Sequence, residues 1–585
     1  MTTGDVLAQA QAWLADDPDP HTRAELGALL EQAQNDDDAS DTGGGAAAAR
    51  EALRERFSGS LEFGTAGLRG ALGAGPKRMN RAVVVRAARG LANYLVRNRT
   101  PVDGHVHHVV IGYDARHGSH QFAVDSAAVC VGAGLRVSVL PSTLPTPILA
   151  FAVRHLDADA GIMVTASHNP AQDNGYKVYL GGPDEGAQIV PPTDEEIAIC
   201  IAEVTSVAEV PRVEQGWTIL TEDIVVSYLQ SVARLVAPEG CRTLRIVLTS
   251  MHGVGGTTAL SALRDAGFTD VHPVAAQAQP DPEFPTVAFP NPEEPGALDQ
   301  AFELATAIQA DLVLAHDPDA DRCAAAIPTA DGSWHRLHGD EVGVLLGDHL
   351  ARRTRAGPLA CSIVSSRMLG AVATAHARGY AETLTGFKWI CRVPGLAYGY
   401  EEALGYCVDP DSVRDKDGIA TAVVLAELAA ALRAGGRTLQ DRLDALSTEH
   451  GVYLSDQISI RFEQDSDIAR TMRRLRSTPP TSLADSRVER VEDLAASSGT
   501  TPSPLPPTDA LRWLTATNAR VILRPSGTEP KLKCYLEVVV AVGDDGPSDG
   551  SHQPRNAHAA LAAARAEARS QMQRLYRDVE RLLAG

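Results

Sequence analysis

A short polar loop places a hydroxyl group, an imidazole and an amine close together in the sequence. The apolar run 160–164 is typical of a strand, and Ser167 and His168 follow it. Asn174-Gly175 predicts a turn, and Lys177 comes ten residues after Ser167. A hydroxyl at the end of an α/β strand, with a lysine nearby, is typical of an activated nucleophile or a phosphate carrier. No G-x-S-x-G surrounds Ser167, which disfavours a hydrolase triad.

A second loop carries three carboxylates at alternate positions. Asp317, Asp319 and Asp321 follow the apolar strand predicted over 311–316. Carboxylates spaced in this way can converge on one hard cation, and oxygen ligands beside phosphate chemistry favour Mg²⁺. An EF-hand is excluded because its sixth position is Arg322 and not glycine. Phosphatases of the haloacid-dehalogenase type have a threonine where Asp321 stands, but a sugar phosphatase with Asp317 as nucleophile stays open as an alternative.

Two further loops combine an arginine with glycine. In FGTAGLRG, residues 63–70, three glycines let backbone N–H groups approach an anion, and Arg69 adds a bidentate donor. In RPSGTEPK, residues 524–531, an arginine, two hydroxyls and a glycine-backed turn make a phosphate cradle. The residues of this cradle are Arg524, Ser526, Gly527 and Thr528.

Composition limits the partners. The 585 residues carry a formal charge of −21, and 44% are hydrophobic. This length allows roughly three to five domains of about 100–200 residues. The negative charge argues against nucleic acid as a partner and requires any phosphate site to be a local basic cluster. The eight cysteines form no C-x-x-C pair, and no apolar stretch is long enough to span a bilayer. We therefore expect a cytoplasmic protein without a membrane partner.

The motifs taken together resemble those of the α-D-phosphohexomutase superfamily, which includes phosphoglucomutases, phosphomannomutases and phosphopentomutases. The strongest matches occur in family order between residues 63 and 531, and they are FGTAGLRG, TASHNP followed by NGYK, DPDADR and RPSGTEPK. TGFKW at 385–389 and EEALGY at 401–406 resemble the family's sugar-binding loops. Ala403 stands where the family usually has a serine, which leaves the choice of sugar open. The EEALGY form resembles most the subgroup of vertebrate phosphoglucomutase-2, a phosphopentomutase, and actinobacterial phosphomannomutases.

The resemblance implies a role for each motif. Ser167 would carry a transferable phosphoryl group, and a sugar bisphosphate would be the intermediate and activator. One Mg²⁺ per chain would be bound by the three aspartates and by an oxygen of phosphorylated Ser167. Lys177, if burial beside cations lowers its pKa, could be the general base, and His168 could assist or only hold the loop. Arg69 would contact the transferring phosphate. The implied substrate-binding residues are Arg322, Lys388, Glu401, Glu402, Arg524, Ser526, Gly527 and Thr528.

The implied fold is α/β, with four domains around a central cleft. Three related mixed α/β domains would span 1–210, 211–328 and 329–447, and a smaller α+β domain would span 448–585. Three segments rich in polar or small residues are expected to contain flexible insertions, near 35–49, in part of 476–510, and near 543–556.

The implied reaction interconverts the 1-phosphate and 6-phosphate of glucose or mannose, in a monomer or a homodimer. A phosphopentomutase and a glucose 1,6-bisphosphate synthase remain as alternatives within the mutase class. A sugar phosphatase and a non-catalytic phosphosugar-binding protein remain as alternatives outside it.

Overall fold

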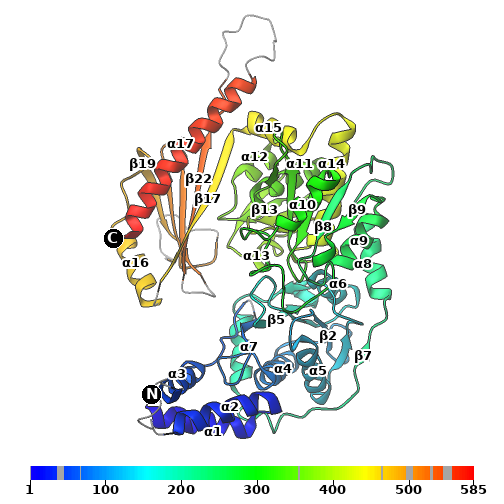
Figure 1. The fold of residues 1–585 in the computed structure, drawn as a ribbon, viewed down its shortest axis with the longest axis vertical. Helices are drawn as coiled ribbons and strands as arrows, with labels where there is room; N and C mark the ends of the chain where they lie inside the picture. The colour runs from blue at the N-terminus through cyan, green and yellow to red at the C-terminus, as the bar shows by residue number, and fades with distance from the viewer. Residues whose placement is uncertain are drawn as a thin grey trace, which may run out of the picture. The chain divides into compact units, whose positions relative to one another are not determined.

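The structure is a computed structural model. It describes residues 2–35, 45–65, 67–353, 356–462, 465–495, 505–526, 531–543 and 557–584. The chain divides into two compact units, which are residues 1–337 with 405–430 and residues 338–404 with 431–585. Figure 1 shows the helices and strands of both units, coloured along the chain.

Three helices open the first unit. They are α1 (Thr3–Asp16), α2 (Pro20–Gln34) and α3 (Gly45–Phe57). Asp19 caps α2 by accepting a hydrogen bond from the N–H of His21, and Pro20 fits the first turn of that helix. The prediction of a flexible insertion over 35–49 is wrong for residues 45–49, which begin α3. Ala49 joins the apolar core that α3 shares with α1 and α2, and residues 36–44 lie outside the described residues.

A seven-stranded mixed sheet follows. Its order is β1-β5-β4-β2-β3-β7, and β6 pairs with β5. The strands are β1 (Leu68–Ala71), β2 (His108–Tyr113), β3 (Arg136–Val139), β4 (Ala160–Val164), β5 (Asp173–Leu180), β6 (Ala187–Gln188) and β7 (Thr218–Ile219). β2, β3, β4 and β7 are parallel, whereas β1, β5 and β6 pair in antiparallel fashion. The parallel part of the sheet directs the loop after β4 to the edge where α/β proteins bind ligands.

Helices cover both faces of this sheet. α4 (Arg81–Asn98), α5 (Ser119–Gly132) and α7 (Thr193–Ala202) share an apolar core with one face, and α6 (Thr146–His155) contacts β2 and β4. Glycines make room for α6, because a Cβ atom at Gly161 would lie 2.4 Å from the side chain of Val153. A short 3-10 helix, η1 (Gly182–Asp184), follows β5.

The turn predicted at Asn174-Gly175 is wrong, because both residues lie inside β5. A Cβ atom at Gly175 would lie 2.5 Å from the carbonyl oxygen of Thr165 and 2.9 Å from that of Leu68. Glycine is therefore required here by the close approach of the backbone on either side, and not by a change of chain direction.

The second sheet of the first unit has five strands in the order β12-β11-β10-β8-β9. They are β8 (Ile246–Thr249), β9 (Val271–Pro273), β10 (Leu312–His316), β11 (Cys323–Pro328) and β12 (Trp334–Arg336). The helices of this part are α8 (Asp223–Ala233), α9 (Gly256–Asp265), η2 (Ala275–Gln277) and α10 (Asp299–Ile308). α10 packs on β8 and β10 through small apolar side chains. β16 (Gly405–Cys407) and most of α14 (Gly418–Ala434) also belong to this unit.

The second unit contains two further groups of strands. β13 (Leu359–Ser362) pairs in parallel with β14 (Tyr380–Thr383) and β15 (Tyr398–Glu401). An antiparallel sheet has the order β17-β22-β21-β20-β19-β18. Its strands are β17 (Val452–Arg461), β18 (Ser482–Leu483), β19 (Ser486–Asp493), β20 (Leu511–Thr515), β21 (Arg520–Pro525) and β22 (Lys531–Val540). The helices are α11 (Gly339–Arg353), α12 (Met368–Ala375), α13 (Phe387–Ile390), α15 (Leu439–His450), α16 (Asp465–Ser477) and α17 (Ala557–Ala584).

Part of 476–510 is predicted to be an insertion, and within this segment residues 482–483 and 486–493 form β18 and β19. β19 pairs with β20, and this pairing makes it part of the sheet despite its polar sequence. Residues 496–504 and 544–556, where the remaining insertion predictions fall, lie outside the described residues. In the described part of the chain, no single helix is both long enough and apolar enough to cross a membrane. α14 and α15 meet these two criteria only when they are taken together, as a bent pair.

Candidate active site

Ser167 lies in the loop between the antiparallel neighbours β4 and β5. Its side chain is 2% exposed, and its backbone is left-handed, with φ of 52°. Oγ1 of Thr165 accepts a hydrogen bond from the N–H of Ser167 over 2.9 Å. A non-glycine residue in this conformation is strained and needs support from its surroundings.

Arg116, which the sequence analysis did not select, provides that support. Its guanidinium donates hydrogen bonds to four carbonyl oxygens of the loop, those of Ser167 (2.7 Å), Asn169 (2.5 Å), Pro170 (2.7 Å) and Asp173 (3.1 Å). The ring of Phe284 lies 4.9 Å from the guanidinium carbon. The available signal was the position of Arg116, just after a strand adjacent to β4.

The three aspartates lie in the loop between β10 and β11. The ligand oxygens of Asp317, Asp319 and Asp321 lie within 4.8 Å of one another, and all three side chains are buried. The hydroxyl of Ser167 donates a hydrogen bond to Oδ2 of Asp317 over 2.8 Å. The structure therefore brings the predicted serine and the predicted carboxylates into one cluster.

These carboxylates fit a hard divalent cation. Among the described residues, Oδ1 of Asp319 and Oδ1 of Asp321 are buried without a hydrogen bond. Buried carboxylate oxygens without donors are costly unless a cation compensates them. An all-oxygen donor set of this kind suits Mg²⁺.

Lys177 lies among the same carboxylates. Its Nζ is 2.7 Å from Oδ2 of Asp319 and 2.7 Å from Oδ2 of Asp321. Burial lowers the pKa of Lys177, but the charges of the two aspartates outweigh burial and raise it. The condition for a lowered pKa, burial beside cations, is therefore not met, because Asp319 and Asp321 outweigh the nearby Lys416.

Two more contacts to the aspartates were missed from the sequence. Oγ1 of Thr146, at the start of α6, donates to Oδ2 of Asp319 over 2.6 Å. Nζ of Lys416 lies 3.4 Å from Oδ2 of Asp321. Asp415, Lys416 and Asp417 stand out as a charged group in the sequence, but nothing there indicates that Lys416 reaches the aspartate loop.

The remaining candidates of the first unit surround Ser167. Arg69 in β1 donates to Oδ1 of Asn169 over 3.1 Å. The backbone N–H of Arg322 donates to Oδ1 of Asp317 over 3.0 Å. Nδ1 of His168 is 3.2 Å from Oγ of Ser167. Burial, Arg322 and Arg69 hold the pKa of His168 well below its usual range, so its imidazole is neutral at pH 7.

A glycine-rich loop after β8 supports the aspartate loop. A Cβ atom at Gly253 would lie 2.4 Å from Cα of Pro318, and the N–H of Val254 donates to the carbonyl of Pro318 over 2.8 Å. Nε2 of His252 lies 2.8 Å from Oγ1 of Thr286. This loop therefore acts through its backbone.

The second unit holds the predicted sugar and phosphate contacts. Oε2 of Glu402 accepts hydrogen bonds from the hydroxyls of Ser362 and Ser365. Arg524 donates to Oγ1 of Thr385 over 2.5 Å, and Lys388 lies in the short helix α13 that follows Thr385. The other described candidates here are Glu401, which is half-buried at the end of β15, and Ser526, whose N–H donates to the carbonyl of Lys531. Gly527 and Thr528 lie outside the described residues.

Four family models match the chain in order. They describe phosphoglucomutase/phosphomannomutase alpha/beta/alpha domain I (residues 60–208), domain II (226–331), domain III (338–450) and the C-terminal domain (481–541). The chain belongs to the phosphoglucomutase/phosphomannomutase family. Membership in this family confirms the expected α/β organisation in four domains and the expected class of enzyme, the isomerases that act as intramolecular phosphotransferases.

Individual family members are similar over most of their length. The chain is 45% identical over 464 residues to a Haemophilus influenzae protein named "Probable phosphomannomutase", covering 78% of this chain and 93% of that protein. It is 34% identical over 551 residues to a Homo sapiens protein named "Phosphopentomutase", covering 85% and 88%. A crystal structure of a family protein from Burkholderia thailandensis shares the fold, with a TM-score of 0.63, 19% identity and coverage of 87% and 96%.

Proposed function

We propose that this chain is a phosphosugar mutase that interconverts the 1-phosphate and the 6-phosphate of glucose or mannose. The observation that carries this proposal is the contact between the hydroxyl of Ser167 and the carboxylate of Asp317, inside a buried cluster of three aspartates. A hydroxyl held next to a cation site, with arginines nearby, is the arrangement that phosphoryl transfer requires.

In the proposed reaction Ser167 starts as a phosphoserine. The bond between phosphorus and Oγ of Ser167 breaks, and a bond forms between phosphorus and the free hydroxyl oxygen of the sugar monophosphate. The hydroxyl proton passes to a base, for which the neutral imidazole of His168 is the candidate, whereas Lys177, whose pKa is raised, stays protonated as the positive partner of Asp319 and Asp321. The resulting bisphosphate turns over and returns its other phosphate to Ser167 by the same steps in reverse.

The residues of the first unit neutralise charge during transfer. One Mg²⁺ per chain, held by Asp317, Asp319, Asp321 and an oxygen of phosphorylated Ser167, would supply positive charge beside the phosphoryl oxygens. Arg69 hydrogen-bonds the phosphoryl group, and Arg322 faces the substrate. The local cations explain how a chain with a charge of −21 can bind a phosphate.

The residues of the second unit bind the sugar and the phosphate that is not transferred. In this proposal Glu401 and Glu402 bind sugar hydroxyls, and Lys388 binds a hydroxyl or a phosphate oxygen. The distal phosphate is assigned to Arg524, Ser526, Gly527 and Thr528. The four domains that supply these groups are proposed to span 1–210, 211–328, 329–447 and 448–585. A sugar bisphosphate is the proposed activator, and a cytoplasmic monomer or homodimer is the proposed form.

A phosphopentomutase, acting on ribose 1-phosphate and 5-phosphate, is the second candidate. Two observations favour it, namely Ala403 in place of a serine hydroxyl and the similarity to the human protein named "Phosphopentomutase". A glucose 1,6-bisphosphate synthase would use the same groups but release the intermediate.

Phosphorus NMR of the full chain with Mg²⁺ and a trace of glucose 1,6-bisphosphate tests the proposal. Glucose 1-phosphate, mannose 1-phosphate and ribose 1-phosphate are supplied separately. Conversion to the 6-phosphate or 5-phosphate, lost in Ser167→Ala, supports a mutase and ranks its sugars. Release of inorganic phosphate that persists in Ser167→Ala and is lost in Asp317→Asn would instead support a phosphatase.

A further inference from the structure

A loop of the second unit contacts the carboxylate of Glu402. Residues 362–367, from the last residue of β13 to the residue before α12, make this loop. The hydroxyls of Ser362 and Ser365 donate to the same oxygen, Oε2 of Glu402, over 3.1 Å and 2.9 Å. Oγ of Ser365 also accepts a hydrogen bond from the N–H of Glu402 over 3.1 Å. The orientation of the Glu402 carboxylate therefore depends on where this loop lies.

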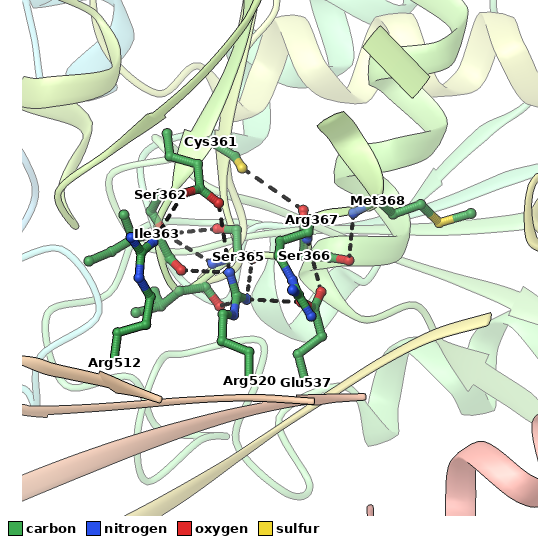
Figure 2. A network of polar contacts seen from close by, with 12 residues as sticks. Cys361, Ser362, Ile363, Ser365, Ser366, Arg367, Met368, Arg512, Arg520 and Glu537 are labelled. Carbon is green, nitrogen blue, oxygen red and sulfur yellow. Dashed lines mark hydrogen bonds and ion pairs between the residues drawn. The ribbon is translucent and has the colours of Figure 1, made fainter. Parts of the chain in front are cut away.

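Two charged residues of the C-terminal sheet hold the loop. Arg520, the first residue of β21, donates to the carbonyl oxygens of Ile363 (2.8 Å) and Ser365 (2.7 Å). Glu537 in β22 accepts from the backbone N–H of Arg367 over 2.9 Å and from its Nε over 2.5 Å. Figure 2 shows these contacts, with the loop above the strands that carry Arg520 and Glu537.

The two residues form a buried ion pair. Arg520 is 2% exposed and Glu537 is 0% exposed, and Nη2 and Oε2 are 3.4 Å apart. A buried charge pair is tolerated only when hydrogen bonds satisfy its remaining donors and acceptors. Here the backbone of the loop supplies several of those partners, so the ion pair and the loop conformation depend on each other.

We propose that Arg520 and Glu537 are positioning residues for sugar recognition, acting through the loop to orient the Glu402 carboxylate. Neither residue has to touch the substrate, because their effect passes through backbone carbonyls and two serine hydroxyls. The inference rests on the proposed function, in which Glu402 binds a sugar hydroxyl.

The first test is a double-mutant cycle on KM. In Arg520→Lys, a single ammonium replaces the planar guanidinium, and it cannot contact both loop carbonyls and the Glu537 carboxylate at once. Arg520→Lys and Ser365→Ala are each expected to raise KM for the sugar 1-phosphate roughly tenfold, the size expected for losing a hydrogen bond to a charged group, with kcat changed little. The double variant is expected to match the larger single effect, because both changes act on one path. Unchanged KM values, or effects that multiply, would overturn the inference.

Two controls separate positioning from general damage. Arg512→Lys removes an arginine of the neighbouring strand β20 that pairs with Glu492 and Glu382, outside the loop. It is expected to leave KM unchanged, and a KM increase equal to that of Arg520→Lys would overturn the inference. Ser365→Thr retains the hydroxyl and is expected to restore KM.

Hydrogen–deuterium exchange tests, without reference to activity, whether Arg520 holds the loop of residues 362–367. The amides of residues 362–367 are expected to exchange faster in Arg520→Lys than in the unmodified chain or in Arg512→Lys, and equal exchange would overturn the inference. Glu402→Gln decides the underlying role separately. Unchanged KM in Glu402→Gln would refute the proposed role of Glu402 alone, while the exchange result would still decide whether Arg520 holds the loop.

Discussion

The hydroxyl of Ser167 and the carboxylate of Asp317 are joined by a 2.8 Å hydrogen bond across 150 positions of sequence. Ser167 lies at the end of a strand of the first sheet, and Asp317 lies at the end of a strand of the second. The contact places the proposed phosphate carrier next to the proposed cation ligands.

Removal of the hydroxyl is expected to abolish mutase activity. In Ser167→Ala, kcat should fall by at least about a thousandfold, because no other group can carry the phosphoryl group. A coupled spectrophotometric assay of sugar 6-phosphate formation measures this. The control is Ser138→Ala, a buried serine of β3 bonded to His108, which should lose stability but retain activity. Comparable losses of activity in the two variants would contradict the prediction.

Loss of one carboxylate is expected to weaken the response to Mg²⁺. Treatment with EDTA should abolish activity, and in Asp319→Asn the Mg²⁺ concentration for half-maximal activity should rise at least about tenfold, since one charged ligand is lost. Titration of activity with Mg²⁺ after chelation measures the change. Asp331→Asn, in the turn between β11 and β12, is the matched control and should titrate like the unmodified chain. An unchanged midpoint in Asp319→Asn would exclude Asp319 as a ligand.

Arg116→Lys is expected to lower kcat roughly a hundredfold, the cost of a misplacement of about 1 Å at a reacting group. A single ammonium cannot reach the four carbonyl oxygens that the guanidinium bonds, so the serine loop should shift. Steady-state kinetics and thermal unfolding measure the two effects. Arg81→Lys, which weakens a bidentate pair with Asp125 elsewhere in the first unit, should lower stability without lowering kcat. If Arg116→Lys lowers only stability, the proposed support of Ser167 is wrong.

Asp417 is expected to make stability depend on pH. Burial raises the pKa of Asp417 to about 6, although the hydroxyl of Tyr228 and the N–H of Ala420 donate to it. The folded state therefore keeps a proton that the unfolded chain releases from about pH 4, so the stabilisation present at low pH is lost as the pH rises through about 6. The loss amounts to about 3 kcal/mol.

Asp417→Asn retains an acceptor oxygen but cannot ionise. Relative to the unmodified chain, its free energy of unfolding should rise by about 3 kcal/mol between pH 4 and pH 7. Urea denaturation of both proteins at the two pH values measures this difference, in which the titration of all other groups cancels. If the free energies of unfolding of the two proteins differ by the same amount at pH 4 and at pH 7, the pKa of Asp417 is not raised.

Local sequence was sufficient for some predictions and not for others. The strands before Ser167 and before Asp317 were predicted because apolar runs are local features. The role of Gly175 was missed, because the Asn-Gly pair is the usual sequence signal of a turn. The sequence alone does not show that the glycine is needed for a close approach to the carbonyls of Thr165 and Leu68. Likewise, β19 was missed because a strand with polar residues is stabilised by its neighbours, here β18 and β20, and not by its own composition.

The sequence by itself determined which chemical groups are present and how the adjacent ones are spaced. That was enough to select the serine and the three aspartates, which the structure brings together, and to propose the phosphate cradle, since each set lies within a few residues of chain. Only the tertiary structure decided that Lys177 faces carboxylates, that Arg116 supports the serine loop, and that Arg520 holds the loop beside Glu402. The physical reason is that strand order and burial set these distances and charges, and both arise from contacts between residues far apart in the chain.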